Sequence, residues 1–179
     1  MARYLMIYHS REGQTFKIMS RFAEQLKATD HEVELLALPE LAESFSLAGY
    51  DIAVIGASVR YGHFSPLLYQ FIERHHHALD AMTSVFFGVN LTARKPEKNT
   101  PETNAYMKKF ALKSPWVPDL QGVFAGACIY SKYTWYDKAV IRFIMKLTKG
   151  PTDTSKDYEF TDWERVDSFA LKLAQLSSK

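Results

Sequence analysis

Short apolar runs alternate along the chain with longer stretches in which apolar residues recur at every third or fourth position. The runs predict five buried β-strands, over Arg3–Tyr8, Glu32–Leu38, Asp51–Gly56, Ser84–Asn90 and Gly122–Tyr130. The periodic stretches predict helices that begin near residues 14, 66, 100 and 161. Alternation of strands and helices is typical of a parallel sheet covered by helices on both faces. The pattern therefore predicts an α/β protein with a doubly wound, five-stranded parallel sheet.

Local signals set the expected starts of two helices. Pro101 has an N1-like position in Thr100-Pro101-Glu102, so a helix is expected to start there. Its apolar face would be formed by Tyr106, Phe110 and Leu112. Thr161 and Glu164 have the spacing of a capping box and predict the start of the last helix.

Composition limits the class of protein. The chain has 179 residues, of which 47% are apolar and 23% charged, so we expect one globular domain over residues 1–179. The single cysteine, Cys128, excludes an internal disulfide, fits a reducing compartment and lies in an apolar run typical of a core. We expect no signal peptide and no spanning helix, because no segment reaches about 18 uninterrupted apolar residues. A net charge of +2 does not indicate a nucleic-acid partner.

The segment His9–Thr15 joins the first predicted strand to the first predicted helix. It contains one glycine and has hydroxyl side chains at Ser10 and Thr15. A tight turn of this kind directs backbone N–H groups and a helix N-terminus to one point, which favours an anion such as phosphate. The alternative is an ordinary strand–turn–helix corner in which Ser10 or Thr15 only caps the helix.

Two further loops follow predicted strands and should lie at the same edge of the sheet. They are Ala57–His63, after the third strand, and Asn90–Lys95, after the fourth. Ligands of doubly wound sheets bind outside the carboxyl ends of the strands. A phosphate loop beside a Tyr-Gly loop and a polar loop has the shape expected for FMN, which carries a phosphate at one end and a flat ring at the other.

Five segments of the chain carry a resemblance to a known family. They are Gly13-Gln14-Thr15, Ile55–His63, Val89–Lys98, Trp135-Tyr136-Asp137 and Thr152-Asp153-Thr154. With them the chain resembles the flavodoxin-like proteins, and more narrowly the quinone-dependent protoporphyrinogen IX dehydrogenases of bacterial haem synthesis. The resemblance covers nearly the whole chain. It implies a flavodoxin-like sheet with strand order 2-1-3-4-5 and an inserted segment, about residues 130–157, before the last helix.

The resemblance also implies a cofactor, a reaction and a location. FMN would be bound non-covalently, with Ser10, Arg11, Glu12, Gly13, Gln14 and Thr15 around its phosphate. Its ring would be flanked by Ala57, Ser58, Val59, Arg60, Tyr61, Gly62, Asn90, Leu91, Thr92 and Ala93. The implied reaction is oxidation of protoporphyrinogen IX to protoporphyrin IX, with electrons passed to ubiquinone or menaquinone. The enzyme would be cytoplasmic and peripherally associated with the inner face of the cell membrane.

Two residues depart from the usual flavodoxin pattern. Glu12 places a carboxylate beside the expected phosphate, so we expect its side chain to point to solvent, with Arg11 offsetting part of the repulsion. Flavodoxins typically hold the ring between two aromatic residues, whereas here Tyr61 alone is available to stack on one face. An open second face suits a substrate that must approach the flavin.

The predicted insert is basic and amphipathic. Residues 135–147 are expected to form a helix, with basic residues at Lys132, Lys138, Arg142, Lys146 and Lys149. Such a helix can lie on a membrane surface or cover a hydrophobic ligand, but it can equally be a lid packed on its own sheet. The run Arg94–Lys98, with Lys108, Lys109 and Lys113 nearby, either attracts the propionates of a tetrapyrrole or is a solvated charged loop.

No catalytic residue follows from the sequence. His63 lies in a ligand-facing loop, where a role in proton transfer or in the turn is equally compatible with the pattern. The run His75-His76-His77 is not expected to bind a metal, because adjacent helical residues point in different directions and no acidic cluster accompanies it. The alternatives to an enzyme are a flavodoxin-type electron carrier and a flavin-free signalling domain of the same topology.

Overall fold

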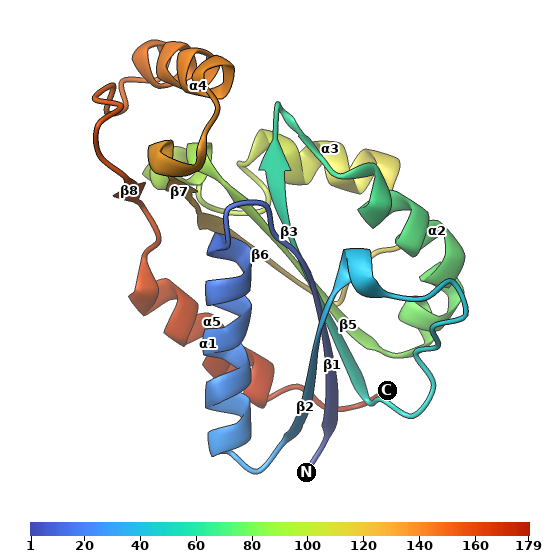
Figure 1. Ribbon diagram of the computed structural model, residues 1–179. Helices are drawn as coiled ribbons and strands as arrows, with labels where there is room; N and C mark the ends of the chain where they lie inside the picture. The colour runs from blue at the N-terminus through green and yellow to red at the C-terminus, as the bar shows by residue number, and fades with distance from the viewer.

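A parallel sheet forms the centre of the computed structural model, which describes residues 1–179 (Figure 1). Its strands are β2 (Glu32–Ala37), β1 (Arg3–His9), β3 (Ile52–Arg60), β5 (Thr83–Asn90) and β6 (Leu120–Ala125), in that spatial order. All four pairings between them are parallel. In order along the chain these strands are arranged 2-1-3-4-5, so the predicted doubly wound fold is confirmed.

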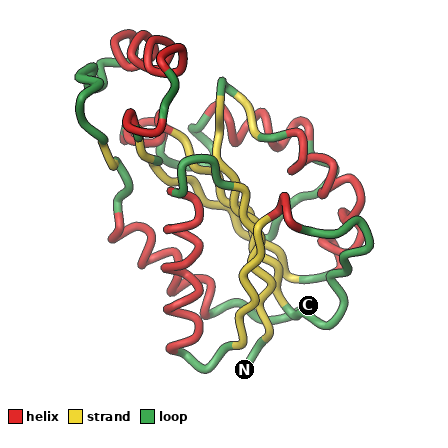
Figure 2. The backbone as a smooth tube through the Cα atoms, viewed as in Figure 1, coloured by secondary structure: helices red, strands yellow, loops and turns green.

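Helices cover both faces of the sheet (Figures 1 and 2). Helices α1 (Gln14–Ala28) and α5 (Trp163–Ala174) pack on one face, and α2 (Pro66–Ala81) and α3 (Ala105–Lys113) on the other. The fully buried strand β5 contributes to both layers, because successive side chains point to opposite faces. Phe86 stacks on Phe110 of α3 with ring centroids 3.9 Å apart, whereas Phe87 packs edge-on against Phe22 of α1.

Strand β3 is longer than predicted and ends in a hairpin. It continues to Arg60, turns at Tyr61-Gly62, and pairs antiparallel with the short strand β4 (His63–Phe64). Both turn residues have positive φ, 49° at Tyr61 and 83° at Gly62, as a two-residue type I′ turn requires. Residues 59–64 of this hairpin extend past the parallel part of the sheet and form one wall of a cleft.

Along the chain, the predicted insert follows the last strand of the sheet, β6, and precedes α5. The fifth predicted strand breaks at Gly126, and the chain continues through β7 (Ala127–Cys128), α4 (Trp135–Leu147) and β8 (Tyr158–Glu159). Strands β7 and β8 pair antiparallel and bring the two ends of the segment together. A separate small core holds α4 in place and consists of Cys128, Tyr130, Tyr133, Ile141 and Met145. None of the helices combines the length and apolarity needed to cross a bilayer.

Four short 3₁₀ turns complete the chain. They are η1 (Leu38–Glu40), η2 (Leu91–Arg94), η3 (Pro96–Lys98) and η4 (Tyr130–Lys132).

Two predicted helix starts are wrong. Helix α3 begins after Asn104, whose buried side chain accepts hydrogen bonds from the N–H groups of Tyr106 and Met107, at 3.1 and 3.4 Å. Pro101 lies in the preceding turn instead. Helix α5 is capped by Asp162 rather than by Thr161, because the Thr161 hydroxyl donates to the carbonyl of Ala125 at 2.7 Å.

Asn104 also supports the loop that follows β5. Its Nδ2 group donates to the Lys98 carbonyl at 2.8 Å and to Oδ1 of Asn90 at 3.2 Å. We expect Asn104→Ala to lower the free energy of unfolding by about 2 kcal/mol or more, because a helix cap is lost and Asn90 keeps an unpaired buried amide. Urea unfolding measures the change.

Leu112→Ala provides the control for this prediction. The sequence placed Leu112 on the apolar face of α3, but the residue is 87% exposed. Its truncation should change the free energy of unfolding by about 0.5 kcal/mol or less. Equal losses in the two variants would contradict the role assigned to Asn104.

Candidate functional site

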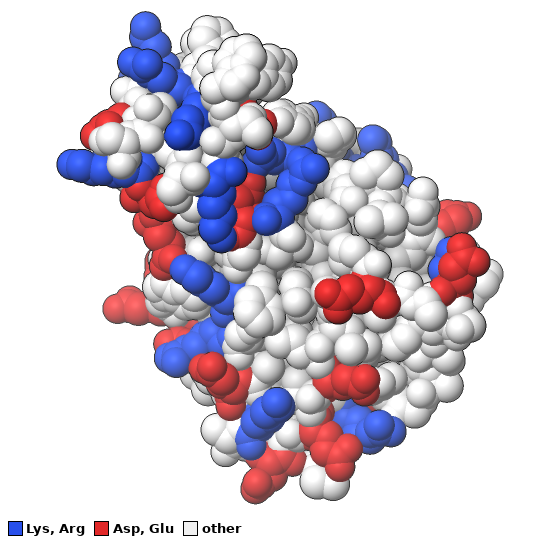
Figure 3. Space-filling model, in the orientation of Figure 1, with Lys and Arg blue, Asp and Glu red and all other residues white.

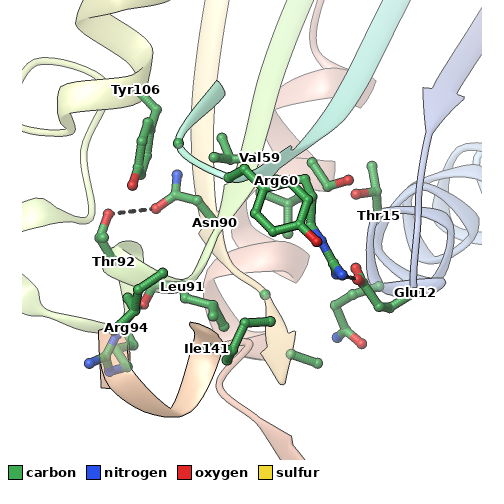
Figure 4. Close-up of a pocket in the computed structure, with 18 of the residues that line it drawn as sticks. Glu12, Thr15, Val59, Arg60, Asn90, Leu91, Thr92, Arg94, Tyr106 and Ile141 are labelled. Atoms are coloured by element: carbon green, nitrogen blue, oxygen red, sulfur yellow. Dashed lines mark hydrogen bonds and ion pairs between the residues drawn. The ribbon is translucent and has the colours of Figure 1, made fainter. Parts of the chain in front are cut away.

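A cleft opens at the carboxyl ends of β1, β3 and β5, between the β3–β4 hairpin, turn η2 and the insert (Figure 4). Most of its lining residues come from the three loops predicted to meet there: Ser10, Glu12, Gln14, Thr15, Ser58, Val59, Arg60, Tyr61, Gly62, Asn90, Leu91 and Thr92. Arg11, Gly13, Ala57 and Ala93 were also predicted, but they do not line the cleft. Ala57 and Ala93 are buried behind it.

The loop between β1 and α1 presents unsatisfied donors to the cleft. Gly13 is the N-cap of α1 with φ of 98°, and no side chain caps the helix. The hydroxyl oxygen of Ser10 accepts from the Gly13 N–H group at 3.1 Å and fixes the turn. The Thr15 hydroxyl is buried and has no hydrogen-bond partner. Uncapped N–H groups, a helix dipole and an unpaired hydroxyl at one point form a site complementary to an anion.

The loop after β5 is rigid because Asn90 organises it from within. Its Oδ1 atom accepts from the Ala93 N–H group at 3.0 Å and from the Thr92 hydroxyl at 2.7 Å (Figure 4). Leu91 and Thr92 thereby face the cleft opposite the β3–β4 hairpin. The cleft has one wall on each side at which a flat ring can pack.

Arg60 lies across the cleft and joins three segments of the chain. Its guanidinium pairs with Glu12 of the first loop and lies 3.1 Å from Oδ1 of Asp137 on α4. The rings of Tyr61 and Tyr133 each lie 5.0 Å from its central carbon. Burial opposes the charge of Arg60, but the Tyr61 hydroxyl and the two carboxylates outweigh it and raise the pKa of the guanidinium. Arg60 is therefore a permanent cation at a largely buried position.

The expectation that Glu12 points to solvent is wrong. Its side chain is only 19% exposed, because the carboxylate turns inward to Arg60 (Figure 4). The nearby backbone carbonyl of Glu12 accepts from Lys132 Nζ at 3.1 Å. Arg60 thus neutralises the charge that Glu12 would otherwise place beside an anion.

The insert supplies a wall of the cleft that the sequence did not assign. Ile141, Ile144 and Thr148 of α4 line it, together with Tyr133 from the preceding turn. The amphipathic pattern of residues 135–147 indicated the helix but not which element it would contact. Asp137 anchors the first turn of α4 to the hairpin, because its carboxylate accepts from the Tyr61 hydroxyl and pairs with Arg60. The hydrogen bond from Tyr61 and the charge of Arg60 lower the pKa of this carboxyl.

Arg94 lines the cleft, and hydrogen bonds within the protein fix its guanidinium. Its guanidinium donates to the carbonyl of Leu91 at 2.7 Å and to the carbonyl and hydroxyl of Thr148 at 3.0 and 2.8 Å. It connects η2 to the end of α4, and burial lowers its pKa. The role predicted for the run Arg94–Lys98 in attracting propionates stays a prediction.

The remaining chemically notable residues play no part in this cleft. Cys128 is fully buried, and burial raises the pKa of its thiol. His76 contacts the carbonyl of Glu73 within α2, and His75 packs on Phe71. No three His, Cys, Asp or Glu side chains are grouped as metal ligands.

Comparison with known proteins defines the class. The flavodoxin domain family matches residues 5–155. The solution structure of two-electron reduced Megasphaera elsdenii flavodoxin matches with a TM-score of 0.53 at 13% identity, covering 67% of this chain and 84% of that one. That likeness concerns the fold alone.

Two relatives narrow the class. Protoporphyrinogen IX dehydrogenase [quinone] of Escherichia coli K12 is 43% identical over 175 residues, which cover 98% of this chain and 96% of that protein. The protein of the same name from Leishmania major is 45% identical over 173 residues, covering 96% of this chain and 74% of that protein. The chain therefore belongs to the flavodoxin-domain family and, within it, to the group that contains these dehydrogenases.

The contacts of Arg60 generate a prediction about stability. Double-mutant cycles with Glu12→Gln and Arg60→Gln should give a coupling free energy of about 1–3 kcal/mol, between the values typical of exposed and buried pairs. Urea unfolding of the wild type, the two single variants and the double variant measures it.

The control is the exposed pair Arg3–Glu32, whose side chains are 52% and 58% exposed. Solvent screening should limit its coupling to about 0.5 kcal/mol. A coupling between Glu12 and Arg60 no larger than that would show that their pairing does not hold the cleft together.

Proposed function

We propose that the chain is an FMN-dependent enzyme that oxidises protoporphyrinogen IX and passes the electrons to a membrane quinone. The observation that carries the proposal is the cleft itself. It has an anion-binding loop with the unpaired Thr15 hydroxyl at one end and two opposed walls at the other. The names of the two relatives supply the substrate and the class of acceptor.

The residues present fit FMN. Ser10, Thr15 and the uncapped start of α1 would hold its phosphate, chiefly through backbone N–H groups. The unpaired Ser58 hydroxyl, Tyr61 and residues Asn90, Leu91 and Thr92 would flank its ring. Bound flavin accepts electrons from a reduced substrate and returns them to an oxidant, which is the chemistry that the reaction needs.

The protein's own contribution is positioning and exclusion of water. Val59, Leu91 and Ile141 provide an apolar lining, and the Asn90 network keeps one wall rigid. Arg60 fixes the insert over the cleft through Asp137. Tyr61 is 52% exposed, so the hairpin leaves part of the site open to an incoming molecule. No side chain is assigned as a general base.

The reaction is tested by the absorbance of the bound flavin. Under anaerobic conditions, protoporphyrinogen IX should bleach the flavin, and ubiquinone or menaquinone should restore it. A flavin that stays oxidised would refute the enzyme. A flavin reduced only by a protein partner would favour the alternative, a flavodoxin-type electron carrier.

Thr15→Val is the matched variant for the cofactor. It keeps the shape of a side chain whose hydroxyl has no partner in the protein, so stability should be unchanged. Affinity for FMN should fall about tenfold while affinity for riboflavin, which lacks the phosphate, stays the same. Equal losses for both would place the phosphate elsewhere.

The outer face of α4 supports peripheral membrane association. Tyr136, Phe143 and Leu147 are 58%, 62% and 68% exposed, and with Val140 they form one stripe at helical spacing. Lys138, Arg142 and Lys146 follow the adjacent flank. Figure 3 shows basic side chains beside an uncharged surface over the insert. An apolar stripe with a basic flank is the pattern of a helix that lies in a membrane interface.

Vesicle binding tests this face. Phe143→Asp with Leu147→Asp should weaken binding to anionic vesicles about tenfold or more, because two apolar side chains no longer enter the interface. Leu112→Asp, at an exposed apolar position of α3, should leave it unchanged. Undiminished binding by the α4 variant in a cosedimentation assay would remove the basis for this docking face.

A further inference from the structure

A second hollow lies beside the cofactor cleft, on the opposite side of the β3–β4 hairpin. We call it the basic hollow. His9, Arg11, His63 and Ser65 line it, and it shares Ser58, Arg60 and Tyr61 with the cleft. No aspartate or glutamate contributes to its lining. The proposed function does not use it.

The polar groups of the basic hollow include atoms without partners. Nδ1 of His9 and the hydroxyl of Ser58 are buried and make no hydrogen bond. Buried polar atoms normally have a protein or water partner. The Ser58 hydroxyl also borders the cofactor cleft, so the unpaired Nδ1 atom of His9 is the one of these two atoms that belongs to the hollow alone, and it indicates a polar ligand there.

The hollow has positive charge that the protein leaves unneutralised. Arg11 is exposed and supplies this charge. Burial, and then the neighbouring Arg11 cation, lower the pKa of His9 and so favour its neutral form. The positive end of the α2 dipole lies at Ser65, the N-cap of that 16-residue helix. Arg60 is different, because Glu12 and Asp137 already pair with it.

The other residues that line the basic hollow are a histidine of fixed orientation and three apolar residues. Nδ1 of His63 lies 2.7 Å from the carbonyl oxygen of Arg60, which can only accept, so Nδ1 carries the proton. His63 is thereby fixed at the rim. Phe64, Pro66 and Leu67 complete the lining, and Leu67 is 43% exposed. A group that combines an apolar body with a short anionic arm matches this surface.

We propose that the basic hollow binds a carboxylate side chain of the tetrapyrrole while its macrocycle lies at the mouth of the cofactor cleft. The inference rests on the proposed function, because the substrate of that reaction carries propionates. Arg11 supplies the charge, and His9, whose Nδ1 atom has no partner in the protein, supplies a hydrogen bond. The hollow and the cleft adjoin, because they share the hairpin residues Ser58, Arg60 and Tyr61.

The test compares protoporphyrin IX with its dimethyl ester, which keeps the ring but loses both negative charges. Binding of each to the FMN-loaded protein is measured by porphyrin fluorescence in the same detergent. Wild type should bind the free acid about tenfold or more tightly than the ester. Arg11→Gln should bring the ratio close to one by weakening only the acid. Arg21→Gln, on the side of α1 that pairs with Asp167, should keep the wild-type ratio.

A second variant guards against misfolding of the first. Leu67→Glu places a carboxylate at an exposed position on the rim and should weaken the acid but not the ester. Retention of the full acid preference in both Arg11→Gln and Leu67→Glu would overturn the proposal. A second result would also overturn the proposal: Arg11→Gln keeps the wild-type ratio of acid to ester binding but no longer binds FMN more tightly than riboflavin. Arg11 would then contact the phosphate of FMN and not the porphyrin carboxylate. Failure of wild type to bind either porphyrin would instead count against the proposed function.

Discussion

The arrangement around the cleft depends on the guanidinium of Arg60. A cation that is only 17% exposed requires anions close by, and no neighbouring residue on its own hairpin supplies one. The carboxylates come from Glu12 and Asp137, which lie far away in the sequence on the first loop and on α4. The guanidinium of Arg60 therefore connects the loop between β1 and α1, the hairpin and the insert. The rings of Tyr61 and Tyr133 pack against this guanidinium.

Sequence reasoning succeeded where the signal was local. Strand β5 and helix α4 follow from the spacing of apolar residues, and the sheet order followed from the family resemblance. It failed where two local signals compete. Pro101 and Thr161 are acceptable helix starters, but Asn104 and Asp162 make the caps. The extension of β3 was missed because Tyr61, a residue that seldom adopts positive φ, occupies the first turn position.

The candidate site was predictable as a set of loops and not as a set of contacts. Parallel strands bring their carboxyl ends to one edge, so the grouping of residues 10–15, 58–62 and 90–92 needs only the topology. The Glu12 side chain points inward because it pairs with Arg60, which is 48 residues away in the sequence. The Arg94 guanidinium is hydrogen-bonded to Thr148, which is 54 residues away. Charge counted along the sequence does not show which cations make internal hydrogen bonds, as Arg94 does, and which are exposed, as Arg11 is.

Helix α4 carries two apolar stripes, and this duality explains its composition. Ile141 and Met145 face the small core, while Tyr136, Phe143 and Leu147 face outward. A lid that only covered its own sheet would need the first stripe alone. Ile141 and Ile144 also line the cleft, so the helix that would touch a membrane is the helix that borders the proposed flavin site. An apolar acceptor such as a quinone would then approach the cleft along α4, whereas a carboxylate side chain of the macrocycle would be bound on the far side of the hairpin.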